Sequence, residues 1–137
     1  MRALDNALFD KLTGDTAPGV GVVALATGGI FRRRPQGSGY PAVEYFKASG
    51  VDAYTYKNRS HRRVVYGVKT VELGLSSEVG ELIYERVDSL LTDGTLDVEG
   101  WELLYIRKAL DISEEEIDGD QHYQHTGAQY EILVAEA

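Results

Sequence analysis

Residues 76–91 form the part of this sequence that most restricts its fold. Their apolar side chains recur at intervals of three and four, so in a helix they form one continuous stripe. Ser76 or Ser77 can cap the first turn, and Glu78 and Glu81 place negative charge at the positive end of the helix dipole. The stripe consists of Val79, Leu82, Ile83, Val87, Leu90 and Leu91. We expect this stripe to pack against a β-sheet.

Three stretches have the two-residue alternation of strands. Residues 42–48 alternate Val43 and Tyr45 with polar or aromatic neighbours, and residues 64–73 are rich in valine. Residues 125–135 place Tyr130, Ile132 and Val134 on one face. These stretches predict the main strands of the sheet.

The N-terminal segment and the connection after it show different patterns. Apolar residues within 3–12 fall near a 3.6-residue period, which predicts a short helix, and Gly14 suits a left-handed helix cap. Residues 14–41 contain all three prolines and many glycines, so a long connection is expected, with a short strand around 20–25.

Polar stretches are assigned to turns and loops. Residues 49–63 are basic and aromatic without apolar periodicity, which predicts a long hairpin loop. Residues 96–98 and 101–108, joined at Glu99-Gly100, predict a small hairpin. Residues 111–121 are strongly acidic and predict a loop.

The order of these elements predicts an α+β fold, with a mainly antiparallel sheet packed by two helices and a long basic hairpin loop. The 137 residues suit one domain, 1–137. Cysteine is absent, which excludes disulfides and thiolate zinc sites and fits folding in a reducing cytoplasm. Asp5 and Asp10 interrupt the apolar N-terminus, so no secretion signal is expected, and the apolar stretch 20–26 is too short to span a membrane.

Charge is divided unevenly along the chain. The net charge of −8 argues against general nucleic-acid binding. Residues 1–69 carry 11 Lys/Arg against 5 Asp/Glu, whereas residues 70–137 carry 3 against 17. This asymmetry favours surfaces of opposite sign that contact other molecules.

The basic segment 54–63 interleaves aromatic rings with cations. Such a segment can bind single-stranded nucleic acid, can be a solvated hairpin tip, or can pair with an acidic protein surface. We favour the third interpretation, because every copy of the chain carries an acidic half. The candidate interface residues are Arg32, Arg33, Arg34, Lys57, Arg59, Arg62, Arg63, Glu114, Glu115 and Glu116.

Patterns typical of enzymes and metal sites are missing. No phosphate-binding glycine motif occurs, and Ser60 beside His61 lacks the context of a catalytic nucleophile. His122 and His125 are three residues apart, which puts them on one face of a helix but on opposite faces of a strand. Because they precede an expected strand, shared metal ligation is awkward. We predict a protein without catalytic residues, without a bound metal and without a cofactor.

Five features follow one another over nearly the whole chain. They are the helix with Ala7-Leu8 and Leu12, the strand entry Tyr40-Pro41-Ala42-Val43, the helix over 78–91 followed by Thr95-Leu96-Asp97-Val98-Glu99-Gly100-Trp101, the turn Asp118-Gly119-Asp120 before His125, and the strand over 130–134. In this order and spacing they resemble the tail-terminator, or tail-completion, proteins of siphovirus-type bacteriophages and of gene-transfer particles.

That resemblance implies a structural virion protein of the tail or neck, made in the host cytoplasm. It implies a ring of six copies that caps the tail tube and offers the docking face for the head connector. The implied partners are other copies, the tail-tube protein and the head-completion or connector protein. DNA would pass through the channel without sequence-specific binding, and no membrane or cofactor is implied. The alternatives are a head-completion stopper of the neck and a small nucleic-acid-binding domain that uses the basic hairpin.

Overall fold

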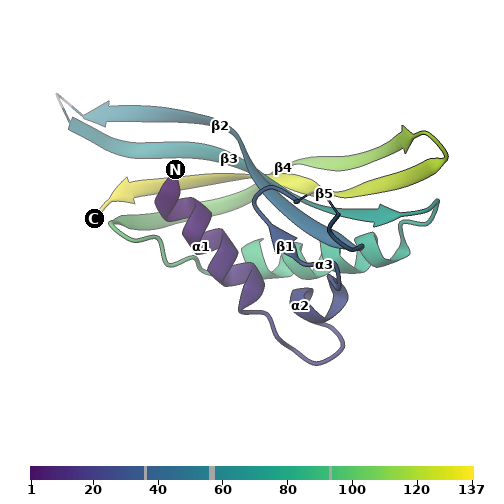
Figure 1. Ribbon diagram of the computed structural model, residues 1–137. Helices are drawn as coiled ribbons and strands as arrows, with labels where there is room; N and C mark the ends of the chain where they lie inside the picture. The colour runs from purple at the N-terminus through teal and green to yellow at the C-terminus, as the bar shows by residue number, and fades with distance from the viewer. Residues whose placement is uncertain (36, 56–57, 93) are drawn as a thin grey trace.

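The computed structural model describes residues 1–137 except 36, 56–57 and 93, and the side chains of 51–60 are also left undescribed. A five-stranded sheet in the order β1-β2-β3-β5-β4 carries its helices on one side, as Figure 1 shows. The elements are α1 (Arg2–Thr13), α2 (Val22–Leu25), β1 (Ile30–Phe31), β2 (Ala42–Thr55), β3 (Asn58–Leu73), α3 (Glu78–Thr92), β4 (Trp101–Asp118) and β5 (Gln121–Glu136). The predicted α+β class is confirmed.

The four long strands pair antiparallel, and only the short β1 is parallel to its neighbour β2. β3 and β5 are therefore interior strands, whereas β4 lies at one edge. At the other edge, β1 covers β2 only at Val43 and Glu44. The sheet is thus mainly antiparallel, as expected.

The core lies between the helices and one face of the sheet. On that face β3 places Val64, Tyr66 and Val68 opposite Ile132, Tyr130 and Ala128 of β5, and all six are buried. From the helix side, the buried residues include Leu4, Leu8, Leu12, Ile83, Val87 and Leu91. The predicted inward face of residues 130–134 is confirmed.

The main helix is rotated slightly from the orientation that its stripe predicts. Ile83, Val87 and Leu91 are buried, but Leu82 is 49% exposed. The prediction that Leu82 belongs to the core is therefore wrong. A stripe of residues at i, i+4 and i+8 already fills the contact with the sheet, which leaves Leu82 at its border. Ser76 contributes to the helix start, because its Oγ accepts a 3.2 Å hydrogen bond from the Glu78 N–H.

The N-terminal helix is anchored to the sheet by a buried polar contact. Tyr66 of β3 donates a 2.5 Å hydrogen bond from its hydroxyl to Asp5 Oδ1. Burial raises the pKa of Tyr66, so the phenol stays a donor. Gly14 follows this helix with φ −77°, so the expected left-handed cap is wrong.

Two predicted loops are wrong because strand pairing extends into polar sequence. The hairpin loop expected over 49–63 is mostly strand, with Val51 paired to Arg63 and Thr55 paired to Asn58. The acidic loop expected over 111–121 is also mostly strand, since β4 continues to Asp118 and pairs with β5. Antiparallel backbone hydrogen bonds form without burial of either face, so apolar alternation gives no signal there.

Two shorter predictions also fail. Residues 22–25 form α2 instead of a strand, and β1 was not expected. Residues 96–98 are not a strand, although Leu96 and Val98 are buried in the core. These two side chains are buried from a segment that belongs to neither a helix nor a strand.

A partly buried ion pair joins the first loop to the main helix. Asp15 accepts hydrogen bonds from Arg86 Nε (2.8 Å) and Nη2 (2.7 Å) and from the Val22 N–H (2.9 Å). Only 5% of the Asp15 side chain is exposed, against 35% for Arg86. The hydrogen bonds from Arg86 lower the pKa of Asp15, so the carboxylate is ionised at neutral pH.

We expect Asp15→Asn to lower the free energy of unfolding at pH 7, with a difference from wild type that shrinks in acid. The folded-state pKa of Asp15 is depressed, so its contribution is present above the unfolded value of about 3.9 and is lost as pH falls below it. Urea unfolding of both proteins between pH 7 and pH 3 measures this difference. A difference that stays constant over this range would contradict a charge-based role for Asp15.

Candidate assembly surfaces

The two long hairpins extend toward opposite ends of the sheet, as Figure 1 shows. The hairpin of β2 and β3 carries Arg62 and Arg63 near its end, and the hairpin of β4 and β5 carries Glu114, Glu115 and Glu116. Lys57 and the side chain of Arg59, also predicted interface residues, lie outside the described residues. The basic residues of the β2–β3 hairpin and the acidic residues of the β4–β5 hairpin thus lie toward opposite ends of the strands.

Arg32, Arg33 and Arg34 lie apart from both hairpin ends. They follow β1 and line an open hollow of about 730 Å³ at the β1–β2 edge of the sheet. Its other lining residues are Glu44, Phe46, Lys47 and Lys69. Five cations therefore surround a single carboxylate, so the hollow attracts anionic groups.

Contacts within the hollow hold its arginines to different degrees. Arg34 Nε lies 3.5 Å from Glu44 Oε1, and its guanidinium is 5.1 Å from the centre of the Tyr40 ring. Arg32 Nη2 lies 3.5 Å from Asp5 Oδ2. Arg33 is exposed and forms no hydrogen bond or ion pair with the side chains that the structure describes. Arg33 is thus accessible to a partner.

The acidic hairpin presents carboxylates on both of its faces. Glu116 and His125 lie on the uncovered face, where Glu116 Oε1 is 2.8 Å from His125 Nε2. Glu115 points to the other face, where it is 3.0 Å from His122 Nδ1. Glu114 is exposed opposite His125. His122 and His125 therefore lie on opposite faces of β5.

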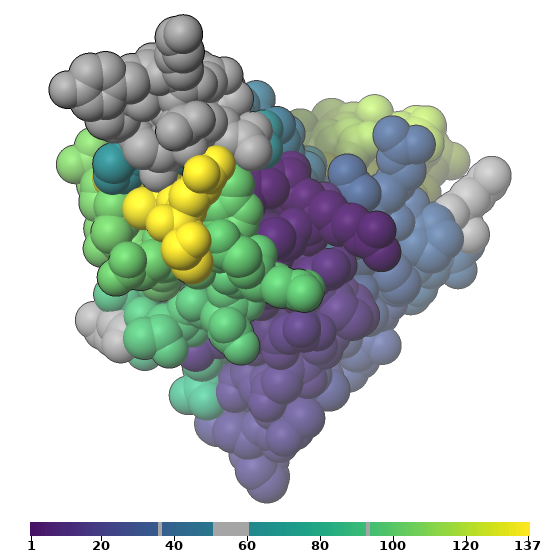
Figure 2. All heavy atoms as spheres, turned by 90° about the vertical axis from the view of Figure 1, so that its left-hand side faces the viewer, coloured from purple at the N-terminus to yellow at the C-terminus, as the bar shows by residue number. Residues whose placement is uncertain are grey.

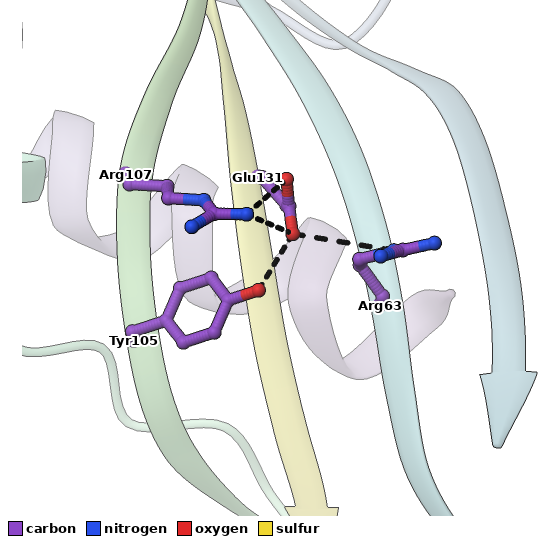
Figure 3. A network of polar contacts seen from close by, with 4 residues as sticks. All are labelled: Arg63, Tyr105, Arg107 and Glu131. Carbon is purple, nitrogen blue, oxygen red and sulfur yellow. Dashed lines mark hydrogen bonds and ion pairs between the residues drawn. The ribbon is translucent and has the colours of Figure 1, made fainter.

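A polar cluster near the opposite end was not predicted. Figure 3 shows Arg63, Tyr105, Arg107 and Glu131, contributed by three adjacent strands. Tyr105 donates a 2.6 Å hydrogen bond to Glu131 Oε1, and Arg107 Nη2 lies 3.2 Å from both carboxylate oxygens. The hydrogen bond from Tyr105 lowers the pKa of Glu131. The alternation of the sequence could predict which face of its strand each residue occupies. Only the register of the three strands brings the four residues together.

Arg63, a predicted interface residue, belongs to this cluster. Its Nε is 4.0 Å from Glu131 Oε1, and 55% of its side chain is exposed. Part of its charge is therefore already balanced within the chain, while its exposed guanidinium can still contact a neighbour.

Among the described residues, no three His, Cys, Asp or Glu side chains gather closely enough to hold a metal ion. The side chain of Ser60 lies outside the described residues, so its relation to His61 is not defined.

None of the helices in the described ranges has the length and apolar character needed to span a bilayer.

Comparison with known proteins gives structural matches only. No family model matches the chain, and no curated protein matches it. A chain of the virion of a native gene transfer agent particle has a TM-score of 0.74 at 12% identity, and the match covers 98% of this chain and 96% of that chain. A second solved chain has a TM-score of 0.52 at 14% identity, with 96% and 94% covered. At these identities the similarity shows a shared fold.

Proposed function

We propose that this chain is a structural virion protein that caps the tail tube of a phage or gene-transfer particle as a ring of six copies. The ring would offer the docking face for the head connector, with DNA passing through its channel unread. The observation that carries the proposal is the fold shared with a gene transfer agent virion chain over 98% of the residues. The ordered sequence features that resemble tail terminators support it.

The distribution of charge is consistent with this role. A cyclic ring uses two different surfaces of each copy, one meeting the other on the next copy. This chain has a hollow lined by Arg32, Arg33 and Arg34 and an acidic hairpin with Glu114, Glu115 and Glu116. We propose these residues, together with Lys57, Arg59, Arg62 and Arg63, as contacts with other copies, the tail-tube protein or the connector. The proposed role requires no catalytic residue, metal or cofactor, and residues 1–137 would act as one domain.

Images of particles test the proposed location. We expect one single-layer ring of this protein at the head-proximal end of each tail. In particles made without it, uncapped tubes should vary in length and should fail to join heads, because nothing ends tube growth or binds the connector. Restoring the wild-type chain is the control. Protein distributed along the tube or inside the capsid would contradict the proposal.

Nucleic-acid binding is the second candidate, favoured by the five cations around the hollow. It predicts that the isolated chain binds DNA or RNA with an affinity that falls steeply as salt rises. The proposed structural role predicts binding to tail-tube protein or self-association instead. Fluorescence anisotropy with labelled oligonucleotides at several salt concentrations separates the two.

A further inference from the structure

We infer that the acidic edge of one copy packs into the basic hollow of the next, with Glu114 beside Arg33. This inference rests on the proposed ring and names the residues of its lateral contact. It differs from contacts at the hairpin ends, because it joins the two side edges of the sheet.

The strand register places the two surfaces at nearly the same level. Glu44 pairs with Lys69, which pairs with Gly127, which pairs with Ile112, so these four residues form one row across the sheet. Phe31, directly before Arg32, pairs with Glu44 at one end of this row. At the other end, Glu114 is two residues beyond Ile112, a distance of about 7 Å along a strand.

Part of the hollow lies on the same face of the sheet as the acidic edge, and the two surfaces lie on opposite edges. Lys69 and Phe46 in the hollow, like Glu114 and Glu116 on β4, are on the face that the helices leave uncovered. The strand order puts β1 and the hollow at one edge of the sheet and β4, with Glu114, at the other. Figure 2, viewed from the left-hand side of Figure 1, shows the start of β4 in green on the flank away from the blue segment around 30–46, whereas the β4–β5 hairpin, in yellow-green, lies farther back at the upper right. If neighbouring copies meet edge to edge, the β4 edge of one copy would therefore lie against the hollow at the β1 edge of the next.

Charge and apolar character match across this contact. Among the described residues, neither Arg33 nor Glu114 forms a hydrogen bond or ion pair within the chain. The Nη1 of Arg34 is buried without a hydrogen-bond acceptor in the described structure, so this guanidinium has donor capacity left. The planar guanidinium groups suit the carboxylate of Glu114, which they can bind through two hydrogen bonds.

An apolar contact lies beside the charged one. Leu110 on β4 is 58% exposed on the uncovered face. Leu110 pairs with Gln129, Gln129 with Gly67, and Gly67 with Phe46, so Leu110 and Phe46 lie in the same row across the sheet. Phe46 also lines the hollow. An exposed edge strand that carries apolar side chains is a surface that a partner normally covers. Leu110 of one copy would therefore pack near Phe46 of the next.

Disulfide trapping tests the contact directly, because the chain contains no cysteine of its own. The pair Arg33→Cys and Glu114→Cys in one chain should form a ladder of covalent multimers when the purified protein is oxidised. The matched control pairs Arg33→Cys with Glu115→Cys, since Glu115 points to the other face. Equal ladders in the two proteins, or none in the first, would overturn the inference.

Charge exchange gives a second, independent test. Arg33→Glu alone and Glu114→Arg alone should each lose the multimers seen in wild-type crosslinking or native mass spectrometry. A mixture of the two variants should recover them, because alternating copies restore an opposite-charge pair at every contact. Continued loss in the mixture, with both variants folded by circular dichroism, would contradict the assignment.

The outcomes also separate this contact from the proposed function. If the Arg33→Cys and Glu114→Cys pair forms disulfide-linked multimers but images show that this protein is absent from the particle neck, the contact is supported and the proposed function is rejected. A ring in the neck without trapping would reject the contact alone. Salt-dependent DNA binding that Arg33→Glu abolishes, without trapping, would assign the hollow to nucleic acid and overturn the contact.

Discussion

An Ile83→Ala variant is expected to lose about 2–5 kcal/mol of unfolding free energy, as large-to-small changes in protein cores do. Ile83 is 1% exposed and lies between α3 and the strands β3 and β5, near Val68 and Tyr130. Both strands are interior to the sheet, so the surroundings cannot collapse easily into the space left by the side chain. Urea or guanidinium unfolding, followed by circular dichroism, measures the loss.

The neighbouring residue provides a matched control. Leu82 is 49% exposed, so Leu82→Ala should cost less than about 1 kcal/mol. Glu85→Ala, on the exposed side of the same helix, should be nearly neutral. Similar losses for Ile83→Ala and Leu82→Ala would show that α3 faces the sheet at a different angle.

A Gly127→Ala variant is expected to lose at least about 2 kcal/mol, because the added methyl group has no space. A Cβ at this position would lie 2.1 Å from the Val68 carbonyl oxygen and 2.6 Å from Lys69 Cα. Both obstacles are backbone atoms of β3, which is held between two other strands. The two central strands would have to separate locally, with loss of ladder hydrogen bonds. Thermal and chemical unfolding measure the effect.

Two other glycines test this explanation. At Gly67 the obstacle is the ring of Phe46, which can rotate away, so Gly67→Ala should cost less than Gly127→Ala. At Gly39 the nearest atom is Gly28 Cα at 3.5 Å, an ordinary contact, so Gly39→Ala should be nearly neutral. A Gly127→Ala protein as stable as Gly39→Ala would mean that the spacing of β3 and β5 differs from the one described.

The failed predictions share a physical origin. Periodicity reports which residues are buried, so it located α1, α3 and the inward faces of β3 and β5. Residues 111–118 are almost wholly exposed, and their strand is held by backbone pairing with β5. Composition alone therefore predicted a loop there. Leu82 fits the apolar stripe, but only the contact with the sheet decides which side of the helix is covered.

The sequence by itself determined the α+β class, the two main helices and the division of charge, because these depend on local composition and periodicity. Only the tertiary structure decided which charges share a surface. Arg63, Tyr105 and Glu131 come together through the register of three strands. The same register places the hollow of Arg32, Arg33 and Arg34 nearly level with Glu114 on the opposite edge. Register arises from pairing between distant segments, so no local pattern contains it.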